Sequence, residues 1–210
     1  MSRIVLIHAT MLSIPPTIDA FALLWPEAEL VHLLDDSLSR DRLAGRETAG
    51  RIVALAEYAV SAKADAILFT CTAFGEAIDL VQRHFQIPVL KPNEAMFDEA
   101  FAKGLNLAML ATFIPSIESL DKEFYQSAPP GSSLKTTFIK GAREAAANGK
   151  QKFHDHLIAE AAASLKGCDA IMLAHFSMST ASELCKEVTD IPILTAPESA
   201  VRKLMRAVQG

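Results

Sequence analysis

Short apolar runs alternate along the chain with longer stretches that repeat apolar residues every three or four positions. The runs have the length of buried β-strands, and the longer stretches have the period of helices packed on one face. Strands are expected at residues 3–8, 66–70, 88–90, 107–111, 170–174 and 193–195. Helices are expected at residues 39–62, 73–84, 94–102, 116–124, 151–165, 180–188 and 199–208. This alternation indicates βαβ units with parallel sheets, and therefore an α/β fold.

One long stretch, residues 127–149, shows neither pattern. It contains Pro129, Pro130 and Gly131, which are residues typical of turns. We therefore expect an irregular loop here, and this loop is a candidate for a mobile lid over a binding site.

The two halves of the chain repeat each other. Residues 65–71 (DAILFTC) match residues 169–175 (DAIMLAH), and at the same spacing residues 87–90 (IPVL) match residues 191–194 (IPIL). Glu94 and Glu198 also match at this spacing, and residues 6–10 resemble residues 108–112. An ungapped match over a strand, a turn, a helix and a second strand indicates duplication. It predicts two similar lobes related by a pseudo-two-fold axis, each a mostly parallel sheet flanked by helices.

The repeat also suggests where the lobes begin and end. Residues 1–95 are expected to form the first lobe and residues 96–196 the second. The last helix, within residues 197–210, is expected to complete the first lobe. Open α/β sheets bind ligands beyond the carboxyl ends of their strands, so the cleft between the lobes is the expected active site.

Matching strands in the two lobes end at residues that can carry chemistry, Cys71 and His175. Each is followed by a predicted helix start, where free backbone N–H groups and the helix dipole favour negative charge. This position favours a Cys71 thiolate with a lowered pKa. A substrate carboxylate is expected to bind at the N–H groups and hydroxyls near Thr72, Ala73 and Ser177. Two acid/base groups on opposite faces of one carbon are the arrangement that inverts a stereocentre.

Together these motifs resemble the aspartate/glutamate/hydantoin racemase superfamily. The resemblance rests on the segment TCT at residues 70–72, the repeated half, the Ile-Pro strands and the segment LATF at residues 110–113, and it covers nearly the whole chain. It implies a two-lobed enzyme without a cofactor, in which one cysteine removes the α-proton and a second cysteine delivers a proton to the opposite face. The chain departs from this pattern at His175, which replaces the second cysteine, and at residues 8–10 (HAT), where amino-acid racemases tend to have Asp-Ser.

The missing second thiol leaves three functions open. The first is a racemase or isomerase acting next to a carboxylate with Cys71 and His175, because an imidazole can serve as base or acid near neutral pH. Its substrate would be an amino acid, a hydantoin or a related 2-substituted acid. The second is an arylmalonate-type decarboxylase or a maleate-type cis–trans isomerase that uses Cys71 alone, as proton donor or nucleophile. The third is a non-catalytic protein that binds small carboxylates.

Further residues are expected to touch the substrate. Thr10 and Thr112 follow matching strands and can either bind a substrate oxygen or cap the next helix. Ser13 has the same two interpretations, and Phe176 follows His175 into the cleft. His8, which ends the first strand, is one more candidate.

Other polar and sulfur-containing residues have structural interpretations. Cys168 and Cys185 are expected in the core, and the segment HDH at residues 154–156 is expected to be a solvated patch. The arginines at positions 40, 42, 46 and 51 alternate with acids, which is typical of a solvated helix face. One of them can still steer anions towards the cleft.

Composition narrows these alternatives. The 210 residues carry a formal net charge of −5 and no basic block, which argues against a nucleic-acid surface. No apolar run reaches the roughly 18 residues of a membrane span, and no signal-peptide pattern is present. The three cysteines have no metal-ligand spacing and fit reduced thiols in a cytoplasmic protein. Without a glycine-rich phosphate loop we expect no nucleotide cofactor, and a homo-oligomer is expected because dimers are the commonest assembly.

Overall fold

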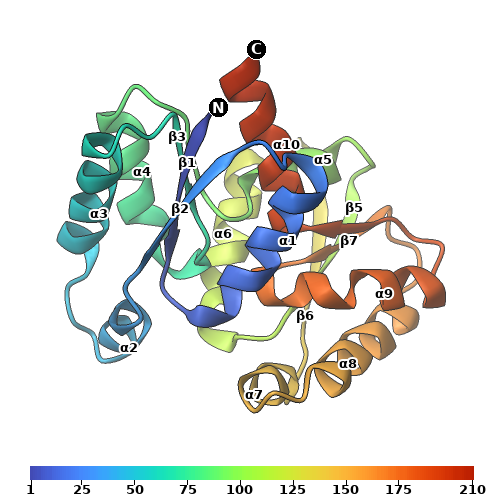
Figure 1. Cartoon of the computed structure of the whole chain (residues 1–210). Coiled ribbons are helices and arrows are strands. Elements are labelled where there is room, and N and C mark those ends of the chain that lie inside the picture. The colour runs from blue at the N-terminus through green and yellow to red at the C-terminus, as the bar shows by residue number, and fades with distance from the viewer.

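A four-stranded parallel sheet forms in each half of the chain. The computed structural model describes residues 1–210 (Figure 1). The first sheet has the order β2-β1-β3-β4 and consists of β1 (Arg3–His8), β2 (Glu29–Leu34), β3 (Ala66–Phe69) and β4 (Val89–Leu90). The second has the order β6-β5-β7-β8 and consists of β5 (Asn106–Ala111), β6 (Ser133–Phe138), β7 (Ala170–Leu173) and β8 (Ile193–Thr195). The predicted α/β fold with two similar lobes is confirmed.

The helices follow the same order in both halves. The first half contains η1 (Met11–Ser13), α1 (Ile14–Leu24), α2 (Ser37–Leu43), α3 (Ala49–Ser61), η2 (Thr72–Phe74), α4 (Gly75–His84) and α5 (Glu94–Phe101). The second contains η3 (Ile114–Ser116), α6 (Ile117–Ser127), α7 (Ala142–Ala147), α8 (Gln151–Ser164), η4 (Phe176–Ala181), α9 (Ser182–Val188) and α10 (Ala196–Gln209). Here η denotes a 3₁₀ helix. Every element of the first half therefore has a counterpart in the second.

Helices cover both faces of each sheet. Along β1, Ile4 and Leu6 belong to one buried cluster while Val5 and Ile7 belong to another, as expected when side chains alternate across a strand. The largest cluster, of 25 residues, joins the inner faces of both sheets to α1, α5, α6 and α10. Two outer clusters join α3 and α4 to the first sheet and α8 and α9 to the second. The two sheets therefore share one layer of helices.

Helix α10 ties the end of the chain to the first half. Its Leu204 is fully buried in the shared cluster, which also contains residues of β1 and β3. On its polar side, Arg202 pairs with Glu99 of α5 at 2.9 Å and Lys203 pairs with Glu94 at 3.0 Å. Because the central layer belongs to both sheets, the division into lobes at residues 95 and 96 stays a prediction.

Strand pairing fixes the register of the repeat. Ile4 pairs with Ala66 in the first sheet, and Leu107 pairs with Ala170 in the second, so Ile4 corresponds to Leu107. Residues 6–10 are therefore equivalent to residues 109–113, one position beyond the segment expected from the sequence. The expected match of Thr10 with Thr112 is wrong, and Thr10 corresponds to Phe113. The match of Cys71 with His175 stands, because each directly precedes the 3₁₀ helix that follows its strand.

The repeated aspartates have a structural role. The carboxylate of Asp65 accepts a hydrogen bond from the backbone N–H of Arg3 at 2.7 Å, and Asp169 accepts one from Asn106 at 2.8 Å. Each aspartate thereby fixes the start of the neighbouring strand. A Cβ atom at Gly104 would lie only 2.6 Å from the Cβ of Asp169, so this arrangement requires glycine at position 104.

Several elements differ from those expected. Residues 39–62 form two helices, α2 and α3, because the chain turns between them at Gly45, which has a φ of 70°. Residues 127–149 are regular and contain β6 and α7, so the expected irregular loop is wrong. Neither α1 nor β2 was expected. Helix α1 begins at Ile14-Pro15-Pro16, where proline is tolerated in the first turn, and β2 is a half-buried edge strand with a weak apolar pattern.

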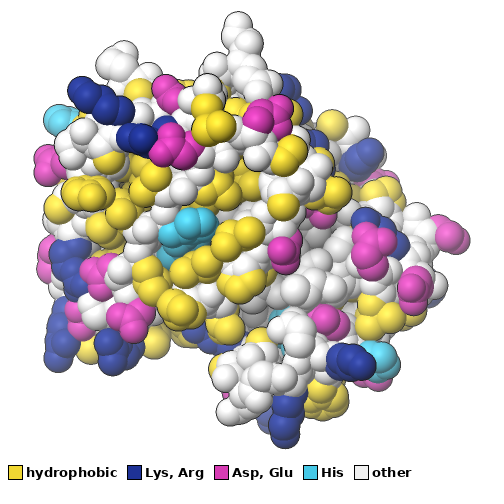
Figure 2. Space-filling model, viewed as in Figure 1, with side chains coloured by type: hydrophobic (Ala, Val, Ile, Leu, Met, Phe, Trp, Pro, Cys, Tyr) yellow, Lys and Arg dark blue, Asp and Glu magenta, His cyan; other side chains and the backbone are white.

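The surface over β2 and α1 is partly apolar. Apolar side chains gather there (Figure 2), and they include the exposed Leu23 of α1 and Leu34 of β2. No helix combines the length and the apolar character needed to cross a membrane.

Substitution of a buried residue in α10 should destabilise the whole molecule. We expect Leu204→Ala to lower the free energy of unfolding by about 2–5 kcal/mol, because it leaves a cavity in the shared cluster. Urea denaturation measures this change. The matched control is Leu23→Ala on α1, where the side chain is 71% exposed and the expected change is within about 0.5 kcal/mol. Equal effects of the two substitutions would contradict a shared central layer.

Candidate active site

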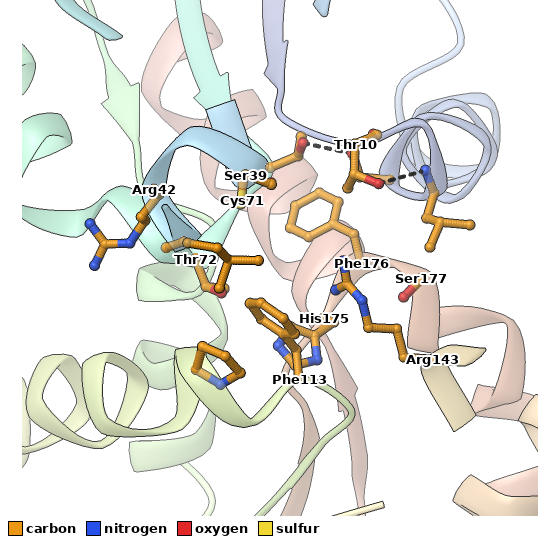
Figure 3. A pocket seen from close by; sticks show the side chains of 16 residues that line it. Thr10, Ser39, Arg42, Cys71, Thr72, Phe113, Arg143, His175, Phe176 and Ser177 are labelled. Atoms are coloured by element: carbon orange, nitrogen blue, oxygen red, sulfur yellow. Dashed lines mark hydrogen bonds between the residues drawn. The ribbon is translucent and has the colours of Figure 1, made fainter. Parts of the chain in front are cut away.

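A small cavity of about 70 Å³ lies at the carboxyl ends of the strands, and both halves line it (Figure 3). Most of the residues expected from the sequence are in its wall, namely Thr10, Ser13, Cys71, Thr72, Ala73, His175, Phe176 and Ser177. Thr112 and His8 lie behind the wall. The remaining lining residues were not among the expected site residues, and they are Leu12, Ser39, Arg42, Leu43, Thr70, Phe113, Pro115 and Arg143.

Cys71 follows β3 in an extended conformation and precedes the short helix η2. Burial raises the pKa of its thiol, against the opposing effects of the Ala73 N–H, the Arg143 guanidinium and the Ser39 hydroxyl. The lowered pKa expected from the helix start is therefore wrong. Desolvation of the anion outweighs one turn of a 3₁₀ helix. The surroundings of Cys71 favour the protonated thiol over the thiolate.

His175 occupies the equivalent position in the second half, but both of its ring nitrogens are engaged. Nδ1 accepts a hydrogen bond from the backbone N–H of Thr112 at 3.2 Å. Nε2 lies 2.9 Å from the hydroxyl of Ser116, which donates its own proton to the carbonyl of Phe113. This arrangement requires the tautomer protonated at Nε2. Burial, and then the charge of Arg143, lowers the pKa of His175 to about 3, so the ring is neutral.

Two arginines reach the cavity from equivalent helices of the two halves. Arg143 of α7 is half-buried, and its guanidinium lies over the ring of Phe113, 4.3 Å from the ring centroid. Its charge acts on both Cys71 and His175. Figure 3 shows its side chain beside His175 and Phe176. Arg42 of α2 is exposed and lies over Phe74 at 5.7 Å. A stacked guanidinium is held in place to bind an anion.

Sequence reasoning missed Arg143 because residues 127–149 were taken as irregular. The sequence pattern predicted a solvated helix face for Arg42. Arg42 is indeed exposed, but it also lines the cavity, which the pattern did not predict. Recognition of β2 and β6 would have shown that the helix after β2 and the helix after β6 are equivalent. Arg42 and Arg143, which lie in these two helices, would then have been identified as a pair near the strand ends.

The remaining candidates are behind the wall or elsewhere. Thr112 contacts Nδ1 of His175 through its hydroxyl at 3.1 Å as well as through its N–H. His8 is fully buried and touches the cavity residues Ser13 and Thr70. The expected solvated patch at residues 154–156 is partly wrong, because His154 is fully buried and bonds Asp155 at 2.7 Å.

The other two cysteines and potential metal ligands lie outside the cavity. Cys185 is fully buried in the outer cluster of the second half, as expected. Cys168 is half-buried and packs at the edge of the same cluster. No three His, Cys, Asp or Glu side chains are arranged to hold a metal ion.

Alkylation should report the state of Cys71. We expect iodoacetamide to label it slowly at neutral pH, with a rate that rises with pH to a midpoint above that of an ordinary thiol. Arg143→Gln should move this midpoint higher, because the guanidinium favours the thiolate. Mass spectrometry of the labelled peptide measures the rate. Arg40→Gln, which removes an exposed arginine outside the cavity, is the control, and a lower midpoint in Arg143→Gln would refute this account.

Acid should destabilise the protein through its buried histidines. The folded-state pKa values of about 4 for His8 and about 3 for His175 lie below the ordinary value of 6.5. The unfolded chain therefore binds more protons below that value, so stability is complete above it and is lost as the pH falls towards the folded values. A fully buried histidine such as His8 contributes a slope of roughly 1.4 kcal/mol per pH unit.

Urea denaturation at several pH values between about 7 and 5 measures this slope. We expect a shallower slope in His175→Gln than in the unsubstituted protein. A free energy of unfolding that stays constant over this range would show that the two rings are not held neutral.

Comparison with known proteins relates this fold to a group of enzymes. No protein-family model matches the sequence, and no curated protein matches it. Among solved structures, the allantoin racemase from Klebsiella pneumoniae superposes with a TM-score of 0.77 at 16% identity, over 100% of this chain and 88% of that one. The Picrophilus torridus aspartate racemase superposes with a TM-score of 0.76 at 13% identity, over 100% of this chain and 95% of that one.

A glutamate racemase from Bacillus anthracis has a TM-score of 0.77 at 12% identity, over 99% of this chain and 82% of that one. Identities this low relate the folds and leave the substrate open. The likeness in fold nevertheless extends over nearly the whole of this chain. The chain therefore shares its fold with these racemases.

Proposed function

We propose that this protein is a racemase or related isomerase that moves a proton at the carbon next to a carboxylate and uses no cofactor. One observation carries the proposal: in a fold shared with three kinds of racemase, a single cavity brings the thiol of Cys71 to the guanidinium of Arg143. A thiol is the proton carrier, and the arginine is the anchor for the substrate anion.

Charge complementarity supports a carboxylate substrate. Arg143 and Arg42 are the charged residues of the cavity wall, and no carboxylate side chain lies in it. An arginine binds a carboxylate through two parallel hydrogen bonds, and its charge also stabilises the enolate that forms when the α-proton leaves. When the thiolate removes that proton, the C–H electron pair moves into the carboxylate system and the sulfur becomes neutral.

The rest of the wall favours a small substrate with an apolar substituent. Leu12, Leu43, Phe113 and Phe176 surround the polar groups, and the volume is small. Amino acids, hydantoins and related 2-substituted acids are the substrates to be tested. The hydroxyls of Thr72 and Ser177 lie in the wall beside Cys71 and His175 and are proposed to bind substrate oxygen.

The second proton carrier decides which reaction is catalysed. In a racemase, His175 would act opposite Cys71, and it would have to exchange its contact with Ser116 for the substrate. The two occupied nitrogens of His175 and its pKa of about 3 instead favour a neutral group that orients the wall. This observation supports a second candidate, a decarboxylase or isomerase in which Cys71 alone protonates an enolate.

We also propose that the protein works in the cytoplasm and without nucleic acid, since its thiols are free and its formal net charge is −5. The apolar side chains over β2 and α1 support a homo-oligomer, because exposed apolar patches of this kind mark contact surfaces.

Proton exchange at carbon tests the function directly. The protein is incubated in deuterium oxide with chiral 2-substituted acids, amino acids, hydantoins, arylmalonates and maleate, and each is followed by proton NMR and chiral chromatography. We expect one class to lose its α-proton signal or to release carbon dioxide. Cys71→Ala should reduce the rate by on the order of 10²–10⁴-fold, while Cys168→Ala, which removes a thiol outside the cavity, should leave it unchanged.

His175→Gln separates the two candidates. Inversion that needs both Cys71 and His175 identifies a racemase with a cysteine and histidine pair. Turnover that survives His175→Gln but needs Cys71 identifies the one-thiol reaction. No turnover in any class would refute the enzymatic proposal and leave a carboxylate-binding protein.

A further inference from the structure

A chain of hydrogen-bonded side chains leads from the cavity into the first half. It begins at the hydroxyls of Ser13 and Thr70, which line the cavity and lie 2.9 Å apart. Both hydroxyls contact Nδ1 of His8, Thr70 at 2.9 Å and Ser13 at 3.1 Å. Nε2 of His8 lies 3.0 Å from Nδ1 of His32. The four side chains are joined without a gap.

The inner part of this chain is sealed, and its outer end reaches solvent. His8 is fully buried, while His32 is half-buried on β2, the edge strand of the first sheet. Figure 2 shows histidine exposed in one patch at the surface over β2. The ring planes are 14° from parallel and the ring centroids are 5.2 Å apart, so with the two nitrogens 3.0 Å apart the rings lie edge to edge and these nitrogens face each other.

The fold does not require these polar residues. In the register of the repeat, His8 corresponds to Ala111 and Thr70 to Ala174, and both alanines are fully buried. A buried imidazole or hydroxyl costs free energy relative to alanine unless every polar atom is satisfied. Ser13 has a polar counterpart in Ser116, whereas His8 and Thr70 are polar only in the half that carries Cys71, and they therefore call for a role in the cavity.

We propose that Ser13, Thr70, His8 and His32 form a proton relay between solvent and the Cys71 side of the cavity. This inference rests on the proposed function, because it supplies the proton that the thiol exchanges. When Cys71 gives its proton to carbon, a thiolate remains and must regain a proton before the next turnover. The relay delivers that proton without opening the cavity to bulk water.

Each transfer in the relay balances. A solvent proton binds Nε2 of His32, whose Nδ1 proton passes to Nε2 of His8. The Nδ1 proton of His8 passes to the Thr70 hydroxyl, and Thr70 or Ser13 releases its own proton into the cavity. One proton enters and one leaves. In each transfer the electron pair of the broken bond stays on the donor atom, and a lone pair of the acceptor atom forms the new bond.

The relay also runs in the opposite direction. The Thr70 hydroxyl can donate to Nδ1 of His8 while Nε2 of His8 donates to His32, because a neutral imidazole accepts at one nitrogen and donates at the other. Burial, and then the neighbouring His32, lowers the pKa of His8 to about 4, and burial lowers the pKa of His32. The rings therefore pass protons on without retaining them at neutral pH.

Substitution of the outer histidine tests the relay. His32→Phe keeps an aromatic ring of similar shape at this position but removes the proton carrier. We expect turnover to fall on the order of tenfold or more and to recover when imidazole is added as a small proton carrier. His84→Phe, which removes an exposed histidine at the end of α4, should keep full turnover and show no response to imidazole. Rescue is a result that a purely structural role of His32 would not give.

A second measurement does not depend on catalysis. In protein labelled with ¹⁵N-histidine, NMR follows the exchange of the His8 ring proton with water. The relay predicts slower exchange in His32→Phe, and in His32→Gln should the first variant not fold, with no change in His84→Phe. Slower exchange in a protein that turns over no substrate would refute the proposed function and support the relay. Unchanged exchange in the His32 variant would overturn the relay, whatever the activity.

Discussion

The structure depends on the need of a parallel sheet to be covered on both faces. The inner strands have apolar side chains on both faces, so a sheet with one bare face would expose part of its core to water. Here two sheets meet this need with one shared layer, formed by α1, α5, α6 and α10. Because both sheets pack on this layer, it fixes them relative to each other. The carboxyl ends of β3 and β7 therefore lie at one cavity, and Cys71 and His175 are both in its wall.

Duplication then supplies two similar halves that have diverged at the cavity. The strand ends retain equivalent backbone conformations at Cys71 and His175, yet one side chain is a thiol and the other a neutral imidazole fixed by Thr112 and Ser116. The arginines have diverged less, since Arg42 and Arg143 come from equivalent helices, but only Arg143 is half-buried over an aromatic ring. The backbone geometry is symmetric, whereas the thiol that we propose as proton carrier lies in the first half and the arginine that we propose as anion anchor lies in the second.

Much of this arrangement was predictable from the sequence because buried strands carry a strong local signal. The strands around Ile4, Ile67, Met109 and Ile171 are continuous apolar runs, and the repeat identified Cys71 and His175 as equivalent. The edge strands β2 and β6 were missed because one side of each faces solvent and their patterns are mixed. The protonation states of Cys71 and His175 could not be predicted from the sequence either. The pKa of Cys71 depends on burial, and the bonds of His175 depend on Thr112 and Ser116, which are distant in sequence.

The place of α10 in the central layer has a consequence for how the chain acquires its structure. During synthesis the first sheet emerges long before α10, so the inner faces of β1 and β3 stay without one of their covering helices until α10 has left the ribosome. Early collapse of the first half therefore leaves apolar surface uncovered, a state prone to association with other chains. Completion of the fold therefore waits for α10, the helix that closes the core.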